Sequence, residues 1–296
     1  MTARASWGFA PGDRISERLI AHDKLGGGRR FETYTAWDER LFVVIVVKLL
    51  RPDLVEDEAS LRSLAAEAQI VERLSHPVIV RSFGARLNGP RPHLVLEHLE
   101  GPTLAHLLKR YGALPLEQLI PLALQVCAAL HYLEEEEVVH LDVKPRNIIM
   151  GAPPRLIDLS IARSFDRARR TLDPIGTDPY MAPEQCEPRG RGRMGAPADI
   201  WGLGASLYHA AAGRRPFVRS KDFDRDDPAA RWPQLEKDPP PLLREVPPPL
   251  AELVSSCLQK DPSLRPTASE VVHSLEPLVA ALPRRRVFGR LRPRLR

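Results

Sequence analysis

Three polar side chains that could take part in a chemical reaction lie close together in the stretch HLDVKPRNII, residues 140–149. They are Asp142, Lys144 and Asn147, and a proline among them keeps the segment from forming a helix. The preceding LALQVCAALHYLEEEEVV has apolar residues at helical spacing, and the following RLIDLSIA is predicted to be a short strand. Polar groups in a loop between buried elements usually hold position for chemistry and not for packing. The rest of the sequence decides what that chemistry is.

A glycine cluster stands near the start of the chain, in LGGGRRFETYTAWDERLFVVIVVKLL. Its first residues are Leu25, Gly26, Gly27 and Gly28, and the segments around it are strand-like. Glycines let the backbone approach a ligand closely and present N–H groups to phosphate oxygens. On this stretch alone an ordinary hairpin turn explains the glycines equally well, and the pattern G-x-x-x-x-G-K-[ST] is absent.

A lysine ends the apolar strand that follows the glycines. The ammonium group of Lys48 must find an anion there or reach water. The stretch SLRSLAAEAQIVERL is predicted to be an amphipathic helix, with Glu67, nineteen positions after Lys48, near the edge of its apolar face. Glu67 is therefore a candidate partner for Lys48. Taken alone, the helix favours the alternative that Glu67 is an exposed, solvated residue.

The basic charge of the chain is concentrated in one segment. The formal net charge is +5 over 296 residues, but seven arginines lie in residues 284–296, so the rest is slightly acidic by the same count. The three cysteines are far apart, which predicts reduced thiols and no cysteine metal site. The longest apolar run, LFVVIVV, has seven residues, whereas roughly 20 are needed to cross a bilayer. We therefore expect a cytoplasmic protein without a transmembrane helix or an export signal.

Further motifs follow the polar loop in a fixed order. They are Asp158 in LIDLS, then GTDPYMAPE, then ADIWGLGASLYHAAAGRRPF, then KDPSLRPT with Arg265. In this order and at this spacing the motifs resemble the eukaryotic-like serine/threonine protein kinases, and the Arg- and Ala-rich style is similar to bacterial members. Each motif is unspecific alone, whereas the full set is highly specific.

The resemblance implies an α+β, two-lobed protein kinase fold. The kinase domain would span residues 19–282, between an N-terminal extension, 1–18, and an Arg-rich tail, 283–296. The N-lobe, about 19–97, would hold a five-stranded sheet and one main helix. The C-lobe, about 98–282, would be mostly helical.

The resemblance also implies roles for individual residues in phosphoryl transfer from ATP. Lys48 matches the strand lysine that holds the α- and β-phosphates, and Glu67 matches the helix glutamate that fixes that lysine. Asp142 matches the aspartate that accepts the proton of the substrate hydroxyl. Asn147 and Asp158 match the ligands of Mg2+ (or Mn2+), whose preference for oxygen they suit.

Other matches concern ATP and the acceptor. Lys144 matches the lysine that touches the γ-phosphate in Ser/Thr kinases. Leu96 matches the residue that closes the back of the adenine pocket in this family, and the backbone of Glu97 and Leu99 would hydrogen-bond adenine. The glycine cluster, Leu25 to Gly28, would cover the phosphates. The implied partners are proteins with Ser or Thr acceptors.

Four further matches are structural. Glu184, in the APE element, is expected to pair with Arg265, and Asp199 is expected to bind backbone N–H groups of the catalytic loop. Thr177 matches a threonine whose hydroxyl bonds Asp142 and Lys144. His140 is expected to pack the loop and to transfer no proton.

The sequence departs from the family pattern at several positions. Phe31 stands where the third glycine is usual, and Thr33 replaces an apolar residue. The usual DFG reads DLS, so Ser160 narrows the backbone freedom of that turn. Leu141 stands where members switched by phosphorylation carry arginine. The changes at Phe31, Thr33 and Ser160 remove no charged group from the implied active site, which favours an active enzyme.

Other functions remain open from the sequence. A nucleotide-binding pseudokinase that acts as a scaffold or allosteric partner would not need Lys48, Glu67, Asp142, Asn147 and Asp158 together. A phosphotransferase of the aminoglycoside type would not be expected to carry Lys144 or APE. The tail RRRVFGRLRPRLR is either a solvated segment or an anchor at an anionic membrane surface, with the inner leaflet as the candidate. Specific nucleic-acid binding is not expected, because Phe288 is the tail's only aromatic residue.

Overall fold

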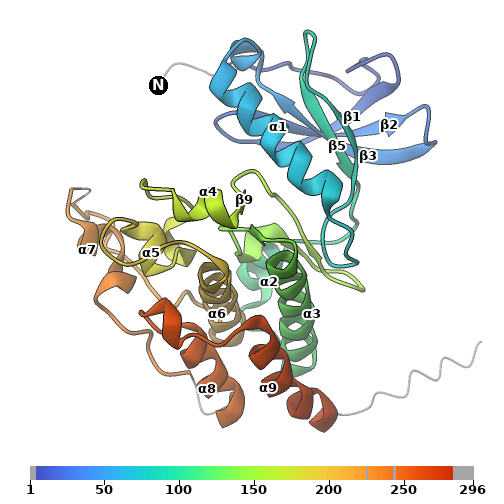
Figure 1. Cartoon of the computed structure of the whole chain (residues 1–296). Helices are drawn as coiled ribbons and strands as arrows, with labels where there is room; N and C mark the ends of the chain where they lie inside the picture. Colours follow the sequence, from blue (N-terminus) through green and yellow to red (C-terminus); the bar gives the residue numbers. More distant parts are fainter. Residues whose placement is uncertain (1–4, 225, 243–244, 283–296) are drawn as a thin grey trace, which may run out of the picture.

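The computed structural model describes residues 5–224, 226–242 and 245–282. Figure 1 shows a small lobe built on a sheet above a larger helical lobe, as the fold prediction requires. The sheet has the strand order β1-β2-β3-β5-β4, and all neighbouring strands are antiparallel. Its strands are β1 (Leu19–Gly27), β2 (Phe31–Asp38), β3 (Val43–Leu50), β4 (Ser82–Arg86) and β5 (His93–Glu97).

Strand β3 lies at the centre of the sheet, and its valines and isoleucine favour extended backbone. Ile45, Val47 and Leu49 alternate onto one face and are fully buried there. Lys48 lies on the opposite face, between Thr33 of β2 and Leu94 of β5. The strand continues to Leu50, so the prediction that Lys48 ends it is wrong: two further apolar residues pair with β2.

Helix α1 (Glu58–Arg73) packs on the sheet, close to its predicted range. Its start is fixed by Asp57, whose carboxylate accepts a hydrogen bond from the Ser60 N–H at 2.8 Å. Leu64, Ala68 and Val71 are buried at the helical spacing expected of an amphipathic face.

The C-lobe is mostly helical, as predicted. Its α-helices are α2 (Leu104–Tyr111), α3 (Leu116–Glu135), α4 (Phe165–Arg169), α5 (Pro183–Cys186), α6 (Ala196–Ala212), α7 (Pro228–Arg231), α8 (Pro248–Cys257) and α9 (Ala268–Ala281). The C-lobe also contains two pairs of short strands. In one pair β6 (Val138–Val139) is antiparallel to β9 (Arg163–Ser164), and in the other β7 (Ile148–Ile149) is antiparallel to β8 (Arg155–Leu156).

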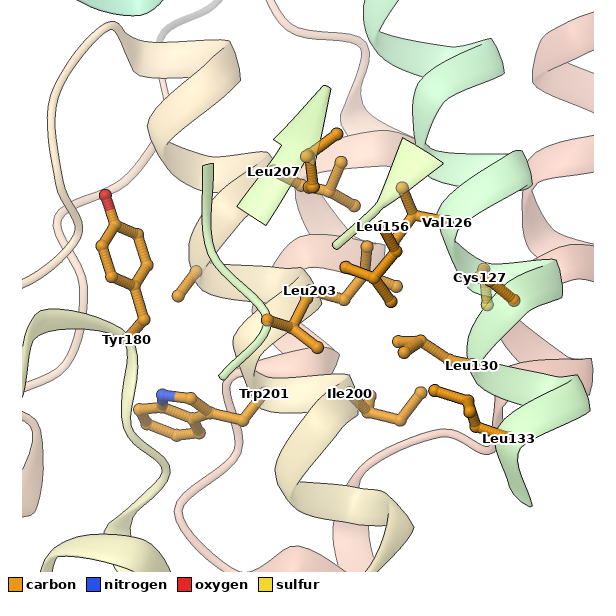
Figure 2. Close-up of a cluster of buried hydrophobic side chains, with 14 of the residues drawn as sticks. Val126, Cys127, Leu130, Leu133, Leu156, Tyr180, Ile200, Trp201, Leu203 and Leu207 are labelled. Atoms are coloured by element: carbon orange, nitrogen blue, oxygen red, sulfur yellow. The ribbon is translucent and has the colours of Figure 1, made fainter. Parts of the chain in front are cut away.

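Helices α3 and α6 form the centre of the C-lobe core (Figure 2). Val126, Leu130 and Leu133 of α3 belong to the same buried cluster as Leu203 and Leu207 of α6. By length and hydropathy α3 is the one described helix that could cross a membrane. Its apolar side chains pack against α6 and α9, as in the core helix of a folded domain.

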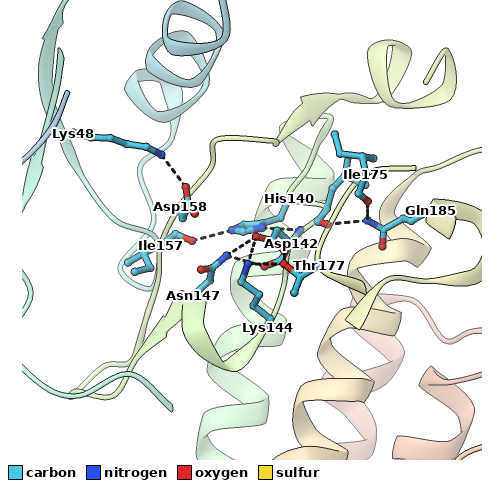
Figure 3. Close-up of polar contacts among 11 residues, drawn as sticks. Lys48, His140, Asp142, Lys144, Asn147, Ile157, Asp158, Ile175, Thr177 and Gln185 are labelled. Atoms are coloured by element: carbon cyan, nitrogen blue, oxygen red, sulfur yellow. Dashed lines mark hydrogen bonds and ion pairs between the residues drawn. The ribbon is translucent and has the colours of Figure 1, made fainter. Parts of the chain in front are cut away.

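The strand predicted at RLIDLSIA is shorter than expected. Only Arg155 and Leu156 are paired as β8, and the prediction is wrong for the residues after them. Asp158 has φ +66°, a left-handed conformation that cannot continue an extended ladder. The chain turns at this point and presents the Asp158 carboxylate to the N-lobe (Figure 3).

Candidate active site

The Asp142 carboxylate is held from three sides (Figure 3). The Thr177 hydroxyl donates to Asp142 Oδ1 at 2.7 Å, and Lys144 Nζ donates to Oδ2 at 2.5 Å. Asn147 Nδ2 donates to the same Oδ2 at 3.0 Å, and Lys144 Nζ also donates to Thr177 Oγ1 at 2.7 Å. Asp142 keeps 9% of its surface exposed, so the fixed carboxylate can still reach an incoming group. The contacts predicted for Thr177 are present.

Asp199 of α6 fixes the backbone of this loop. Its two carboxylate oxygens accept hydrogen bonds from the N–H groups of His140 and Leu141, both at 2.7 Å. Burial raises the pKa of Asp199 to about 7, although both N–H donors favour its charged form. Leu141 has φ +64°, which is unusual for a branched residue, so the two bonds hold a local conformation that leucine disfavours.

His140 is fully buried and packs the loop, as expected. Its Nδ1 accepts from the Asp142 N–H at 3.3 Å, so Nε2 carries the proton that is shared with the Ile157 carbonyl at 3.2 Å. Burial lowers the pKa of His140. Both ring nitrogens are occupied by backbone groups, which leaves none for proton transfer to a ligand.

Lys48 joins the two lobes through two carboxylates. Its Nζ donates to Glu67 Oε1 and to Asp158 Oδ1, each at 2.8 Å. Glu67 is only 3% exposed, which contradicts the solvated alternative and agrees with the predicted pair. Burial alone would lower the pKa of Lys48, but the two carboxylates raise it above its ordinary value. Burial likewise opposes ionisation of Asp158, and the nearby Lys48 charge holds the pKa of that carboxyl well below its usual range.

A cleft of about 1390 Å³ lies between the sheet and the C-lobe. All predicted nucleotide and metal residues line it: Leu25, Gly26, Gly27, Gly28, Lys48, Leu96, Glu97, Leu99, Asn147 and Asp158. Asp142, Lys144 and Glu67 do not line the cleft, but Asn147 and Lys48 connect them to it. The cleft thus brings the glycine cluster and the polar loop to one site.

Several apolar residues of the cleft are missing from the sequence prediction. Val46, Val80, Ile149 and Ile157 line it together with Leu96. Val46 stands two positions before Lys48 on the same face of β3, and Ile149 two positions after Asn147. The two-residue period of a strand therefore held the signal for Val46, whereas Asn147 lies in a 3-10 turn before β7, so no strand period indicates Ile149.

Gln185 is a further residue that the sequence prediction omits. Its Nε2 donates to the carbonyl of Leu141 at 2.8 Å and to that of Ile175 at 2.9 Å (Figure 3). One side chain thereby ties the polar loop to the segment that carries Thr177. No sequence motif indicates this role, because both partners are backbone carbonyls.

The two substitutions in the glycine-rich region have clear positions. Phe31 does not adopt a left-handed backbone, and its ring lies 4.9 Å from Lys48 Nζ. Thr33 is paired with Lys48 across β2 and β3 and also lines the cleft. Both side chains therefore face the cleft and fit the ordinary geometry of a strand.

The comparisons with known proteins agree with this geometry. The chain matches the protein kinase domain family over residues 19–275. It is 32% identical over 283 residues to the serine/threonine-protein kinase PknB of Mycobacterium leprae (strain TN), covering 89% of this chain and 44% of that protein. It is 32% identical over 259 residues to PknA of Mycobacterium tuberculosis (strain ATCC 25177 / H37Ra), covering 84% of this chain and 57% of that protein. The chain spans about half the length of these curated relatives. By its matched residues, its two-lobed fold and its site, the chain belongs to the protein kinase domain family.

Proposed function

We propose that the chain is an ATP-dependent serine/threonine protein kinase, which transfers the γ-phosphate of ATP to Ser and Thr hydroxyls of proteins and phosphorylates itself. The main support is one arrangement: Lys48 with its two carboxylates lies at the cleft, and Asn147, which lines the same cleft, hydrogen-bonds the fixed Asp142 carboxylate. Phosphoryl transfer depends mainly on positioning and charge neutralisation, which such a site can supply.

In this proposal ATP lies in the cleft with its adenine toward Leu96. Val46, Val80 and Ile149 supply apolar surface for the ring. The N–H of Glu97 already donates to a backbone carbonyl, so Glu97 would offer its own carbonyl to adenine. Residues 25–28 would cover the phosphates, and Lys48 would bind them as a protonated ammonium group.

A divalent ion, Mg2+ or Mn2+, fits the side chains at the base of the cleft. Asn147 uses its Nδ2 for Asp142, which leaves its Oδ1 available to a cation. Asp158 uses one oxygen for Lys48, and its side chain is 38% exposed. Among the described residues no three His, Cys, Asp or Glu side chains gather as a metal site. An ion held by Asn147, Asp158 and phosphate oxygens matches the habit of Mg2+, and when bound it would neutralise phosphate charge.

Asp142 is the residue that we assign to the substrate hydroxyl. Its carboxylate would orient this hydroxyl and accept its proton. Lys144, bonded to both Asp142 and Thr177, would add positive charge beside the γ-phosphate. Thr177 restricts the carboxylate to one orientation, since its hydroxyl donates to Asp142 and accepts from Lys144.

The alternative function is a pseudokinase that binds nucleotide without transfer. Incubation of the purified chain with labelled ATP and Mg2+ or Mn2+, followed by mapping of labelled residues, separates the two. Label on Ser or Thr is expected. Tight ATP binding without label on the chain or on an added protein acceptor would support the pseudokinase.

Thr171 is the candidate for control by phosphorylation in the segment between Asp158 and Glu184. Its hydroxyl accepts from the Arg163 guanidinium and donates to the Arg167 carbonyl at 2.9 Å. Leu141, beside Asp142, is only 2% exposed and offers no cation. A phosphate on Thr171 would therefore lack the usual link to the catalytic loop.

We expect Thr171→Ala to lower kcat/KM toward an exogenous substrate by less than about tenfold, under roughly 1.4 kcal/mol. Thr177→Ala is the contrasting variant, because it removes a direct contact to Asp142, and it should cost more. A collapse of activity in Thr171→Ala, with recovery in Thr171→Glu, would show instead that a phosphate on Thr171 controls the site through another cation, for which Arg163 is the candidate.

The kinase domain is proposed to span residues 19–282, with the N-lobe ending near residue 97.

The arginine-rich tail, 283–296, lies outside the described residues. We propose a cytoplasmic protein whose tail holds it at anionic membrane, because each basic residue near such a surface contributes about 1 kcal/mol. Co-sedimentation with anionic vesicles should fall when the chain ends at Pro283. Equal binding by both forms would contradict the membrane role.

A further inference from the structure

Residues 5–9, the N-terminal strap, cover the outer face of the sheet. The rings of Trp7 and Phe9 stack with centroids 5.9 Å apart, and Phe9 meets Tyr34 of β2 edge-on at 5.5 Å. Trp7 Nε1 donates to the Leu50 carbonyl at the end of β3, at 2.7 Å. The strap is thus packed against β2, the strand that follows the glycine-rich loop, and hydrogen-bonded to the end of β3.

Glu32, the second residue of β2, lies under the strap and is fully buried. Its carboxylate accepts four hydrogen bonds, from Lys24 Nζ at 2.5 Å and, each at 3.1 Å, from the Trp7 N–H, the Tyr34 hydroxyl and Arg51 Nη1. Burial opposes ionisation, but the bond from Lys24 and its other donors hold the pKa of Glu32 at about 2. A charged carboxylate therefore joins the strap to β1, β2 and the residue after β3.

Arg51 connects this carboxylate to the glycine-rich loop itself. Its Nε donates to the Gly28 carbonyl at 2.9 Å, and its Nη1 donates to the Ala5 carbonyl at 2.8 Å as well as to Glu32. The backbone N–H of Arg51 donates to the Arg30 carbonyl at 2.9 Å. One residue therefore holds the strap, the buried carboxylate and both ends of the loop tip.

The strap and the nucleotide cleft lie on opposite faces of the same strand. Phe31 and Thr33 line the cleft, whereas Glu32 and Tyr34 face the strap, as the two-residue alternation requires. Because residues 26–28 line the cleft too, a bond that fixes their backbone from outside also fixes the cover of the phosphate site.

We propose that the strap, acting through Arg51 and Glu32, positions the glycine-rich loop for ATP. Arg51 and Glu32 are positioning residues, since neither lines the cleft. The inference rests on the proposed ATP-dependent function. Glycines lose more conformational freedom than other residues when they are ordered, so a loop that is ordered before ATP arrives loses less affinity on binding. The strap therefore supports ATP binding and leaves the chemistry at Asp142 unchanged.

The decisive variant is Arg51→Ala. It should raise KM for ATP, and the Kd for ATP measured by calorimetry, about fivefold or more while kcat stays within about threefold, because uniform binding is lost. Arg51→Lys keeps the charge for Glu32 but has no planar fork to reach Gly28 and Ala5 together, so it should fall between Ala and wild type. Arg14→Ala is the matched control: Arg14 pairs with Glu39 in the same lobe and has no bond to the loop or the strap.

A second variant tests the strap without touching Arg51. Trp7→Ala should raise the Kd for ATP in the same direction and speed hydrogen exchange at the backbone amides of residues 26–31. If Arg51→Ala and Trp7→Ala are folded and bind ATP like wild type, the strap has no positioning role. If the wild type itself neither binds ATP nor transfers phosphate, the proposed function fails first, and the two failures are thus distinguishable.

Discussion

Asp142→Asn is expected to slow phosphoryl transfer by about 10² or more while ATP binding stays near wild type, because the carboxylate orients the acceptor hydroxyl and lies outside the cleft. Asparagine has nearly the same shape, so its amide can stay between Thr177 and Asn147. It loses the negative charge that Lys144 contacts at 2.5 Å, and it cannot accept a proton from the substrate. The measurement is single-turnover transfer from labelled ATP with saturating acceptor, together with calorimetric ATP binding.

Lys48→Met provides the comparison on the nucleotide side of the site. This change should also stop transfer, because it removes the cation that would bind the phosphates of ATP. It also leaves Glu67 and Asp158 without their shared cation. ATP affinity should therefore fall in Lys48→Met and stay near wild type in Asp142→Asn. Wild-type turnover in Asp142→Asn would show that the catalytic assignment is wrong.

The sequence predicted the fold and most of the site because the order and spacing of the motifs match those of one family, which assigns each motif to a place in the fold. The two-lobed fold, the α1 helix and the Lys48–Glu67 contact follow from strand and helix periodicity combined with the family resemblance. Periodicity alone did not decide whether Glu67 is buried or exposed, since a glutamate at the edge of an apolar face is buried only when a cation lies opposite it. That cation comes from β3, nineteen positions earlier, and only the tertiary structure brings the two together.

Several features that the sequence did not predict depend on hydrogen bonds from a side chain to a backbone carbonyl far away in the sequence. Trp7 contacts the carbonyl of Leu50, 43 positions away, and residues before Leu19 show no periodic pattern that would indicate packing on the sheet. The strand prediction extended past Leu156 because apolar composition cannot reveal the left-handed turn at Asp158. Local propensity is thus overridden where the active site needs a specific backbone conformation.

The largest expected change in stability comes from the buried pair between Glu184 and Arg265. The guanidinium donates to both carboxylate oxygens, Nη1 to Oε1 at 2.6 Å and Nη2 to Oε2 at 2.8 Å, and neither side chain is exposed. The remaining Arg265 donors reach the carbonyls of Pro197, Gln259 and Lys260. The pair therefore joins α5, next to the segment with Thr177, to the start of α6 and the residues before α9.

Arg265→Leu is expected to lower the free energy of unfolding by about 3–5 kcal/mol, because it leaves the Glu184 carboxylate buried without a partner. Arg265→Lys should lose less, since the charge remains but the bidentate contact does not. The double variant Arg265→Leu with Glu184→Gln removes the buried charge and should recover part of the loss. Denaturant unfolding of the wild type, of these three variants and of Glu184→Gln alone measures these differences. A double variant as unstable as the sum of its single changes would mean that the pair contributes no coupling, and that the cost of Arg265→Leu arises from its three carbonyl partners instead.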